Sequence, residues 1–164
     1  MYKYTLAFIK RKDEVLMLNR NKSPWMGSWN GVGGKREVNE SGLSAIKREI
    51  YEETGIKVND KEIVDKGIVT WNSYDENGNG LHLFLVEISD DFIYETPRVV
   101  KEGILDWKKI NWISNYDNYG VCHNIPYFIN YVIFDSNKYN HKCIFKDKVL
   151  LSVKNEILNE SMIE

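Results

Sequence analysis

The sequence predicts an α/β fold in which a mixed β-sheet is covered by helices on both faces. Two observations indicate this class. Short β-type runs lie both before and after one segment whose apolar residues Leu43, Ile46 and Ile50 recur at helical spacing. A second helical segment comes late, over residues 126–134, with Pro126 in its first turn. A sheet that meets helices from different parts of the chain buries both of its faces against them.

The first third of the chain reads as strands followed by the first helix. The expected elements are a strand over 2–9, a charged turn over 10–14, a strand over 15–19, a loop over 20–28 and a short strand over 29–32. The first two strands form a hairpin, and the short strand runs into Gly33 and Gly34. Asn39 or Ser41 would cap the helix that follows, and Gly55 would end it.

The remaining elements are assigned from β-type runs separated by turn residues. They are strands over 63–74 and 81–88 across a polar turn at 75–80, an irregular segment over 89–97, a strand from about 102 to 113, a loop over 116–124, the helix over 126–134, and a hairpin of 141–145 and 149–153. The sequence shows no internal repeat, linker or boundary. We therefore expect one domain over residues 1–164.

Composition excludes several classes of partner. A formal net charge of −2 argues against a nucleic-acid polymer, which needs a basic surface, whereas a small polyphosphate needs only a few local cations. No apolar run reaches the ~18 residues of a membrane span, and the N-terminus is not a signal peptide. Cys122 and Cys143 suit buried, unpaired thiols in a reducing cytoplasm. We expect a cytoplasmic protein with no membrane partner, and its oligomeric state stays open.

Three carboxylates on the first helix predict a cation site. Glu49, Glu52 and Glu53 stand at positions i, i+3 and i+4, so they share one region of the helix surface. Like charges this close repel each other and raise some of the pKa values. A hard divalent cation with oxygen ligands offsets that cost. The alternative is an acidic face that is simply solvated.

The residues around these glutamates form a known motif. Its fixed positions are Gly34, Glu40, Arg48-Glu49-Ile50, Glu52-Glu53 and Gly55-Ile56. They match G-x5-E-x7-R-E-U-x-E-E-x-G-U, where U is a bulky aliphatic residue, so the sequence resembles the Nudix hydrolases. The resemblance implies an α/β/α sandwich with the motif as strand, loop and helix. It also implies hydrolysis of a diphosphate bond with Mg²⁺, or Mn²⁺ as an alternative, as cofactor.

The same resemblance implies roles for individual residues. The implied metal ligands are Glu49, Glu52, Glu53, the carbonyl of Gly33 and the more distant Glu102. Arg48 would orient the glutamates without touching substrate, and Glu40 would fix the loop to the helix. Gly34 and Gly55 are structural positions of the motif. Glu53 is the first candidate for the general base, followed by Glu52 or Glu102.

Substrate-binding residues are also suggested by position. Lys35 and Arg20 match phosphate-binding positions, although either could be a solvated cation. The segment 29–35 is similar to the MutT-like branch that removes oxidised purine nucleotides, in which Asn30 would hydrogen-bond the purine with Thr5 nearby. Asn30 could instead be a turn residue. That branch carries a tryptophan and two aspartates before its late helix, where they stack on and read the oxidised base. This chain offers Tyr116, Asp117 and Tyr119 there, which provides aromatic rings for stacking but no acidic pair in line with Pro126.

The resulting hypothesis is hydrolysis of a small-molecule nucleoside triphosphate to monophosphate and pyrophosphate, with oxidised purines such as 8-oxo-dGTP as the suggested substrates. A second enzymatic hypothesis is hydrolysis of another nucleoside diphosphate derivative, namely a dinucleoside polyphosphate, ADP-ribose or capped RNA. A third is a nucleotide-sensing module without catalysis. The complete set of motif glutamates argues against the third. The phosphorus that is attacked stays open.

Overall fold

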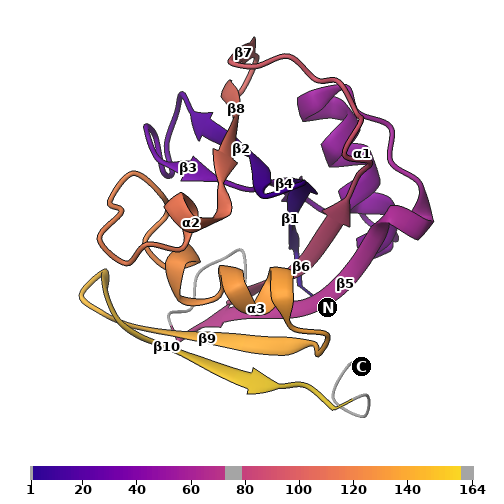
Figure 1. Cartoon of the computed structure of the whole chain (residues 1–164). Helices are drawn as coiled ribbons and strands as arrows, with labels where there is room; N and C mark the ends of the chain where they lie inside the picture. The colour runs from indigo at the N-terminus through magenta and orange to yellow at the C-terminus, as the bar shows by residue number, and fades with distance from the viewer. Residues whose placement is uncertain (1, 73–78, 160–164) are drawn as a thin grey trace.

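The computed structural model describes residues 2–72 and 79–159, and Figure 1 shows how their helices and strands are arranged. The strands are β1 (Tyr4–Arg11), β2 (Glu14–Arg20), β3 (Trp29–Asn30), β4 (Val32–Lys35), β5 (Ile63–Trp71), β6 (Gly80–Glu87), β7 (Arg98–Val100), β8 (Gly103–Lys109), β9 (Tyr139–Lys146) and β10 (Val149–Ile157). The helices are α1 (Gly42–Thr54), α2 (Ile110–Ile113) and α3 (Ile129–Phe134), with 3₁₀ turns η1 (Asp60–Glu62) and η2 (Ile125–Tyr127).

The strands form one mixed sheet in the order β10-β9-β5-β6-β1-β2-β8-β7. The pairs β1–β6 and β5–β9 are parallel, and the other neighbours in this order are antiparallel. The short strands β3 and β4 lie off this path, because β3 pairs with β2 and β4 pairs with β1. The predicted mixed sheet is confirmed.

Successive side chains of β1 point to opposite faces of the sheet, and each face has its own hydrophobic core. Ala7 and Ile9 face one side, where Ile46 and Ile50 of α1 pack, whereas Phe8 faces the other side together with residues of α2 and α3. Figure 1 shows α1 and α3 on opposite sides of the central strands. The two-sided cover expected from the sequence is therefore present.

Helix α1 begins and ends as its terminal residues dictate. The Ser41 hydroxyl accepts a hydrogen bond from the Ser44 backbone N–H at 3.1 Å, so Ser41 is the N-cap. The other candidate cap, Asn39, lies in the preceding loop with a φ of 62°. Gly55 ends the helix at a φ of 76°, and its N–H donates to the Tyr51 carbonyl.

Several predicted boundaries are wrong. The strand expected over 29–32 is two strands, which separate at Gly31 where a Cβ would lie 2.6 Å from the Ala7 carbonyl oxygen. The strand expected to reach residue 113 ends at Lys109, because the apolar residues after it form the buried helical turn α2. The strand expected over 63–74 ends at 71, and most of the turn predicted at 75–80 lies outside the described residues.

Other differences concern the second half of the chain. Strand β7 was not predicted, and it pairs with β8 across a turn at Lys101 and Glu102. The late helix is divided into η2, which contains Pro126, and α3. The C-terminal hairpin is confirmed and extends further than expected, over 139–146 and 149–157. Cys122 and Cys143 are buried and free, as expected.

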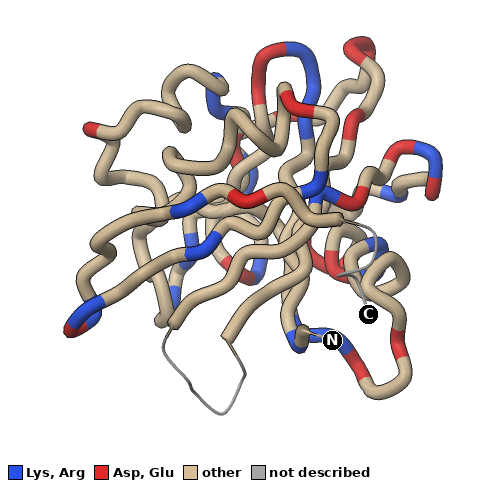
Figure 2. Tube along the Cα trace, turned by 90° about the horizontal axis from the view of Figure 1, so that it is seen from below, with Lys and Arg blue, Asp and Glu red and all other residues tan. Residues whose placement is uncertain are grey.

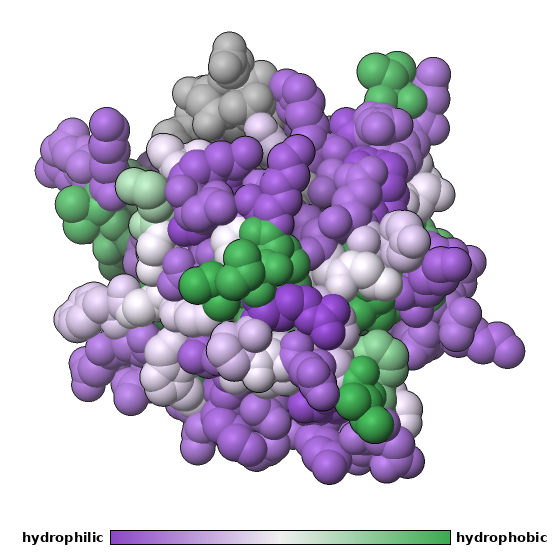
Figure 3. All heavy atoms as spheres, turned by 90° about the horizontal axis from the view of Figure 1, so that it is seen from above, coloured by the Kyte–Doolittle hydropathy of each residue, from purple (hydrophilic) through white to green (hydrophobic). Residues whose placement is uncertain are grey.

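The surface carries charges of both signs. Figure 2 shows acidic and basic segments distributed around the trace. The face seen in Figure 3, on which the β7–β8 turn lies, is mostly hydrophilic with separate apolar patches. No helix in residues 2–72 and 79–159 is long and apolar enough to cross a membrane.

Candidate active site

A cavity of about 310 Å³ lies between helix α1 and the β7–β8 turn. Its lining residues are Glu49, Glu52 and Glu53 from α1, with Lys101 and Glu102 from the turn. The helical spacing of the three glutamates places them together, and pairing of β8 with β2 and β7 brings Glu102 to them from about fifty residues away in sequence. The structure therefore brings together the four glutamates that the sequence singled out.

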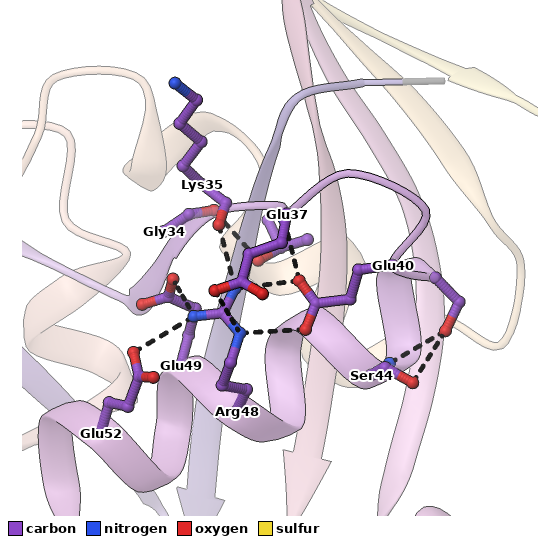
Figure 4. A network of polar contacts seen from close by, with 10 residues as sticks. Gly34, Lys35, Glu37, Glu40, Ser44, Arg48, Glu49 and Glu52 are labelled. Carbon is purple, nitrogen blue, oxygen red and sulfur yellow. Dashed lines mark hydrogen bonds and ion pairs between the residues drawn. The ribbon is translucent and has the colours of Figure 1, made fainter.

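Arg48 is the centre of a hydrogen-bond network beside this cavity (Figure 4). Its Nε and Nη2 donate to the two carboxylate oxygens of Glu40 at 2.9 and 3.0 Å. Its Nη1 donates to Glu49 at 2.9 Å and to Glu52 at 3.1 Å, and Nη2 also donates to the Lys35 carbonyl at 3.0 Å. An arginine side chain has five N–H donors, so all five are used within the protein. This geometry suits a positioning residue that does not touch substrate.

Glu40 fixes the loop before α1 to the helix. Besides Arg48, its carboxylate accepts a hydrogen bond from the Glu37 backbone N–H at 2.9 Å. The Arg48 guanidinium is the main reason that the pKa of Glu40 falls to about 2, and the Glu37 N–H acts in the same direction. Glu40 is therefore charged at neutral pH, and it holds Arg48 in place.

Gly34 makes room for the carboxylate of Glu49. A Cβ at position 34 would lie 2.5 Å from Cδ and from Oε2 of Glu49. Any side chain there would displace this carboxylate from Arg48. The requirement for glycine at this point of the motif is thus steric.

Glu53 has the most perturbed carboxylate of the cavity. Its Oε2 is buried without a hydrogen-bond partner. Burial, followed by the nearby charges of Glu49 and Glu102, raises the pKa of Glu53 to about 8, while the Gly33 backbone N–H and the Arg20 charge oppose this rise. Burial also raises the pKa of Glu49, against the opposing effect of Arg48.

The backbone of Gly33 is turned toward these carboxylates. Residues 32–35 all lie opposite β1, and the Arg36 N–H donates to the Lys3 carbonyl. Because hydrogen-bonded and non-hydrogen-bonded pairs alternate in an antiparallel ladder, the backbone N–H and C=O groups of Gly33 and Lys35 point away from β1. On that side Arg48 binds the Lys35 carbonyl, and the Gly33 N–H acts on Glu53. The Gly33 carbonyl lies on the same edge.

These groups fit a hard divalent cation. The carboxylates and the Gly33 carbonyl are oxygen donors, and a cation would offset the repulsion that leaves Glu53 with an unpaired buried oxygen. In the described part of the chain, histidine, cysteine and acidic side chains do not close into a group of three or more around one point. The reason is geometric, because Glu49 and Glu52 both turn toward Arg48. A cation would draw at least one of them toward Glu53.

Two lysines near the cavity were missed by the sequence analysis. Lys101 lines the cavity, and Lys22 lies with its Nζ 3.5 Å from Oε2 of Glu102. Neither lysine stands in a recognisable motif. For Lys101 there was one signal, because it stands next to the predicted ligand Glu102 in the sequence.

The predicted phosphate-binding residues lie at the edge of this region. The Lys35 side chain is exposed and points away from the carboxylates in Figure 4. Arg20 acts electrostatically on Glu53, and its Nε donates to the Lys22 carbonyl at 3.4 Å. A phosphate contact for either residue stays a prediction.

The predicted base-binding residues lie on three segments of the chain, Asn30 in β3, Thr5 in β1 and Tyr119 in the loop between α2 and η2. The Asn30 carboxamide oxygen accepts a hydrogen bond from the Gly31 N–H at 2.8 Å, while its Nδ2 has no partner among the described residues. Thr5 is buried, and its hydroxyl donates to the Gly34 carbonyl at 3.3 Å, which fastens β1 to β4. Tyr119 is 91% exposed and lines a different cavity, of about 350 Å³, beside η2 and the β9–β10 turn. Substrate contacts for these three residues stay predictions.

An aromatic cluster missed by the sequence analysis joins the loop over 20–28 to the late loop. Trp25 lies against His123 with ring centroids 4.7 Å apart, and the Phe145 ring meets His123 edge-on at 5.4 Å. Burial lowers the pKa of His123, and its Nε2 is buried without a partner. Trp25 has a φ of 68°, which is unusual for a residue with a large side chain.

Comparison with known proteins agrees with this geometry. A family model described as the NUDIX domain matches residues 3–117. An uncharacterized Nudix hydrolase of Bacillus subtilis, YvcI, is 28% identical over 120 residues, which are 70% of this chain and 70% of that protein. The oxidized purine nucleoside triphosphate hydrolase of Mus musculus is 28% identical over 110 residues, which are 67% of each chain.

A solved structure shows the same fold over almost the whole chain. The mutator MutT protein of Bacillus halodurans superposes with a TM-score of 0.71 at 26% identity, covering 94% of this chain and 97% of that one. The expected α/β/α arrangement is thus confirmed. With a family model that spans most of the sequence, the chain belongs to the Nudix family of hydrolases, enzymes that cleave diphosphate bonds in nucleoside diphosphates linked to a further group and generally use divalent metal ions.

Proposed function

We propose that this chain hydrolyses a nucleoside triphosphate to monophosphate and pyrophosphate with Mg²⁺, or Mn²⁺ as an alternative, and that oxidised purine nucleotides such as 8-oxo-dGTP are its preferred substrates. The observation that carries the proposal is the carboxylate cavity, in which Glu53 keeps a buried, unpaired oxygen beside Glu49 and Glu102. This arrangement suits a metal-bound polyphosphate.

The chain's own residues divide the work as follows. Glu49, Glu52, Glu53 and Glu102, with the Gly33 carbonyl, would hold the metal, which supplies charge neutralisation on the phosphate oxygens. Glu53 accepts the proton of the attacking water as the water oxygen bonds to phosphorus and the bridging P–O bond breaks. Its raised pKa of about 8 reflects the site without a cation, and a nearby positive charge lowers that pKa and frees the carboxylate as a base. Arg48 keeps Glu49 and Glu52 in place.

The base would bind between β3 and the aromatic cluster of Trp25, His123 and Phe145. The free Nδ2 of Asn30 is a donor for a purine acceptor, and the neutral imidazole of His123 adds a polar atom beside two apolar rings. The name of the mouse relative supports oxidised purines as the class to test first.

The test uses the purified chain with MgCl₂ or MnCl₂ and a panel of nucleotides. The panel contains 8-oxo-dGTP, dGTP, dCTP, ADP-ribose, a dinucleoside polyphosphate and capped RNA, and release of pyrophosphate is measured against release of phosphate. We expect pyrophosphate from the triphosphates and the highest kcat/KM for 8-oxo-dGTP. Higher kcat/KM for ADP-ribose, or equal values for dGTP and dCTP, would contradict the proposed substrate class. The Glu53→Gln variant should be inactive, and Glu95→Gln is a matched control because Glu95 is exposed and lies outside the cavity.

A further inference from the structure

The loop over 20–28 is hydrogen-bonded to the β7–β8 turn, whose residues Lys101 and Glu102 line the carboxylate cavity. The Asn21 backbone N–H donates to the Glu102 carbonyl at 3.1 Å, and the Asn21 Nδ2 donates to the Lys101 carbonyl at 3.0 Å. The loop is closed on itself by the Gly27 N–H, which donates to the Arg20 carbonyl at 2.8 Å. Lys22 is therefore held close to the cavity by its neighbours in the chain.

Lys22 contacts the carboxylate of Glu102 from this loop. The distance from Nζ to Oε2 is 3.5 Å, and the two side chains are 63% and 30% exposed. Lys101 is a second cation at the same place, because it lines the cavity itself. Two lysines from different segments of the chain therefore lie at Glu102, one as its ion-pair partner and the other as its neighbour in the cavity lining.

The charges inside the cavity are divided unequally. Arg48 binds Glu49 and Glu52, and Lys22 binds Glu102, whereas no lysine or arginine of residues 2–72 and 79–159 forms an ion pair with Glu53. A divalent cation that binds Glu102 therefore competes with Lys22 for the same carboxylate. If Glu102 turned to such a cation, the ammonium of Lys22 would lose its partner beside the cavity and would be available to the negative charge of a polyphosphate.

We propose that Lys22 has two successive partners, Glu102 before the cation binds and the outer phosphates of the substrate afterwards. Lys22 and Lys101 together would then select substrates that carry a charged group beyond the cleaved bond. The inference rests on the proposed function, since it concerns the pyrophosphate part of a nucleoside triphosphate. A pyrophosphate leaving group carries several negative charges, whereas a neutral sugar in the same place would gain nothing from two ammonium groups.

The first experiment measures cation binding without any nucleotide. Mn²⁺ is titrated into the wild type, Lys22→Ala and Lys22→Arg by isothermal titration calorimetry. Removing a competing ion pair of this exposure should tighten Mn²⁺ binding by about two- to fivefold in Lys22→Ala. Lys22→Arg should stay near the wild type. Lys47→Ala is the matched control, because Lys47 pairs with Asp60 at 2.7 Å away from the cavity. Weaker Mn²⁺ binding in Lys22→Ala would overturn the proposal, since Lys22 would then be supporting Glu102.

The second experiment measures binding of the two product types. Magnesium pyrophosphate and AMP are titrated separately into the same variants and into Lys101→Ala. Loss of a charged hydrogen bond should weaken pyrophosphate binding roughly tenfold in Lys22→Ala and in Lys101→Ala. AMP binding should not change. An equal loss for AMP, or unchanged pyrophosphate binding, would overturn the assignment.

The two measurements also separate this inference from the proposed function. Both rely on binding and neither needs turnover. If the wild type failed to hydrolyse triphosphates, the proposed function would be wrong, yet the contrast between pyrophosphate and AMP would still decide the role of the two lysines. A merely structural role of Lys22 would weaken the binding of Mn²⁺, pyrophosphate and AMP together, whereas the proposal requires changes of opposite sign for Mn²⁺ and pyrophosphate.

Discussion

Replacing Arg48 tests how much of the site depends on geometry. Arg48→Ala removes five hydrogen bonds and leaves Glu40, Glu49 and Glu52 without their shared cation. Arg48→Lys keeps a positive charge, but an ammonium has three donors and cannot form the two parallel bonds to Glu40. The pair of variants therefore separates charge from geometry.

The expected magnitude follows from the position of Arg48 outside the set of metal ligands. Loss of such a partner typically lowers activity or metal affinity by about 10- to 100-fold, which is about 1.4–2.7 kcal/mol at ~1.4 kcal/mol per factor of ten. The pKa values also move. Because Arg48 lowers the pKa of Glu40 and of Glu49, removing it raises both, so the acid limb of the pH–activity profile should shift to higher pH.

The assay is kcat/KM for pyrophosphate release between pH 5 and 9 at saturating MgCl₂. Arg11→Ala is a suitable control for the loss of an arginine away from the cavity, because Arg11 donates to the Phe92 carbonyl at 2.9 Å and lies 4.0 Å from the centre of the Trp107 ring. We expect Arg48→Lys to recover little of the loss. Full recovery in Arg48→Lys would show that charge alone matters, and a nucleotide complex with Arg48 on a phosphate would refute the positioning role.

The remaining predictions concern single groups. Glu52→Gln and Glu53→Gln should each lower turnover at least ~10²-fold, since each removes one negative charge from the metal site while keeping size; near wild-type rates in both would disprove the site. Gly34→Ala should lose activity while circular dichroism stays unchanged, because its Cβ would lie 2.5 Å from the carboxylate of Glu49, a proposed metal ligand. Asn30→Ala should weaken purine nucleotides by roughly 1–3 kcal/mol and leave pyrimidines nearly unchanged; an equal loss for both would assign this residue to the loop. His141 is buried with a pKa lowered to about 4, so folding stability should be full above about pH 6.5 and fall by about 3 kcal/mol toward pH 4, a slope that urea unfolding should show and that His141→Gln should flatten.

The parts of the fold that follow from local rules were predictable from the sequence. Helix α1 has its cap, its apolar stripe and its terminal glycine within fifteen residues, so each signal is read directly. The motif also placed Glu40, Arg48 and the three glutamates on facing parts of one loop and helix. The short strand was only partly predictable. Its division at Gly31 depends on the close approach of the Ala7 carbonyl, which comes from a distant strand.

Side-chain partners within the site were harder to predict for the same reason. Asn30 was selected because an amide can both donate and accept, yet its oxygen already accepts from the next backbone N–H. This leaves both N–H donors of Nδ2 but only one lone pair of the oxygen for substrate, so Asn30 has one acceptor site fewer than a free amide. Thr5 was suggested by the resemblance alone, and its buried hydroxyl hydrogen-bonds the Gly34 carbonyl and so links β1 to β4, a contact that depends on the pairing of two strands.

The pair of Lys22 and Glu102 shows what determines such contacts. Eighty residues separate the two in sequence, and no periodicity connects them. They meet because β2 pairs with β8 in a register that sets Arg20 opposite Gly103. This close pairing requires glycine, since a Cβ at position 103 would overlap the Asn19 carbonyl oxygen. The glycine thus allows the β7–β8 turn to approach the end of β2, where the loop with Lys22 begins. Consequently the charge balance at the mouth of the cavity depends on strand register, and a substitution at Gly103 should disturb the site even though this residue has no side chain to contribute.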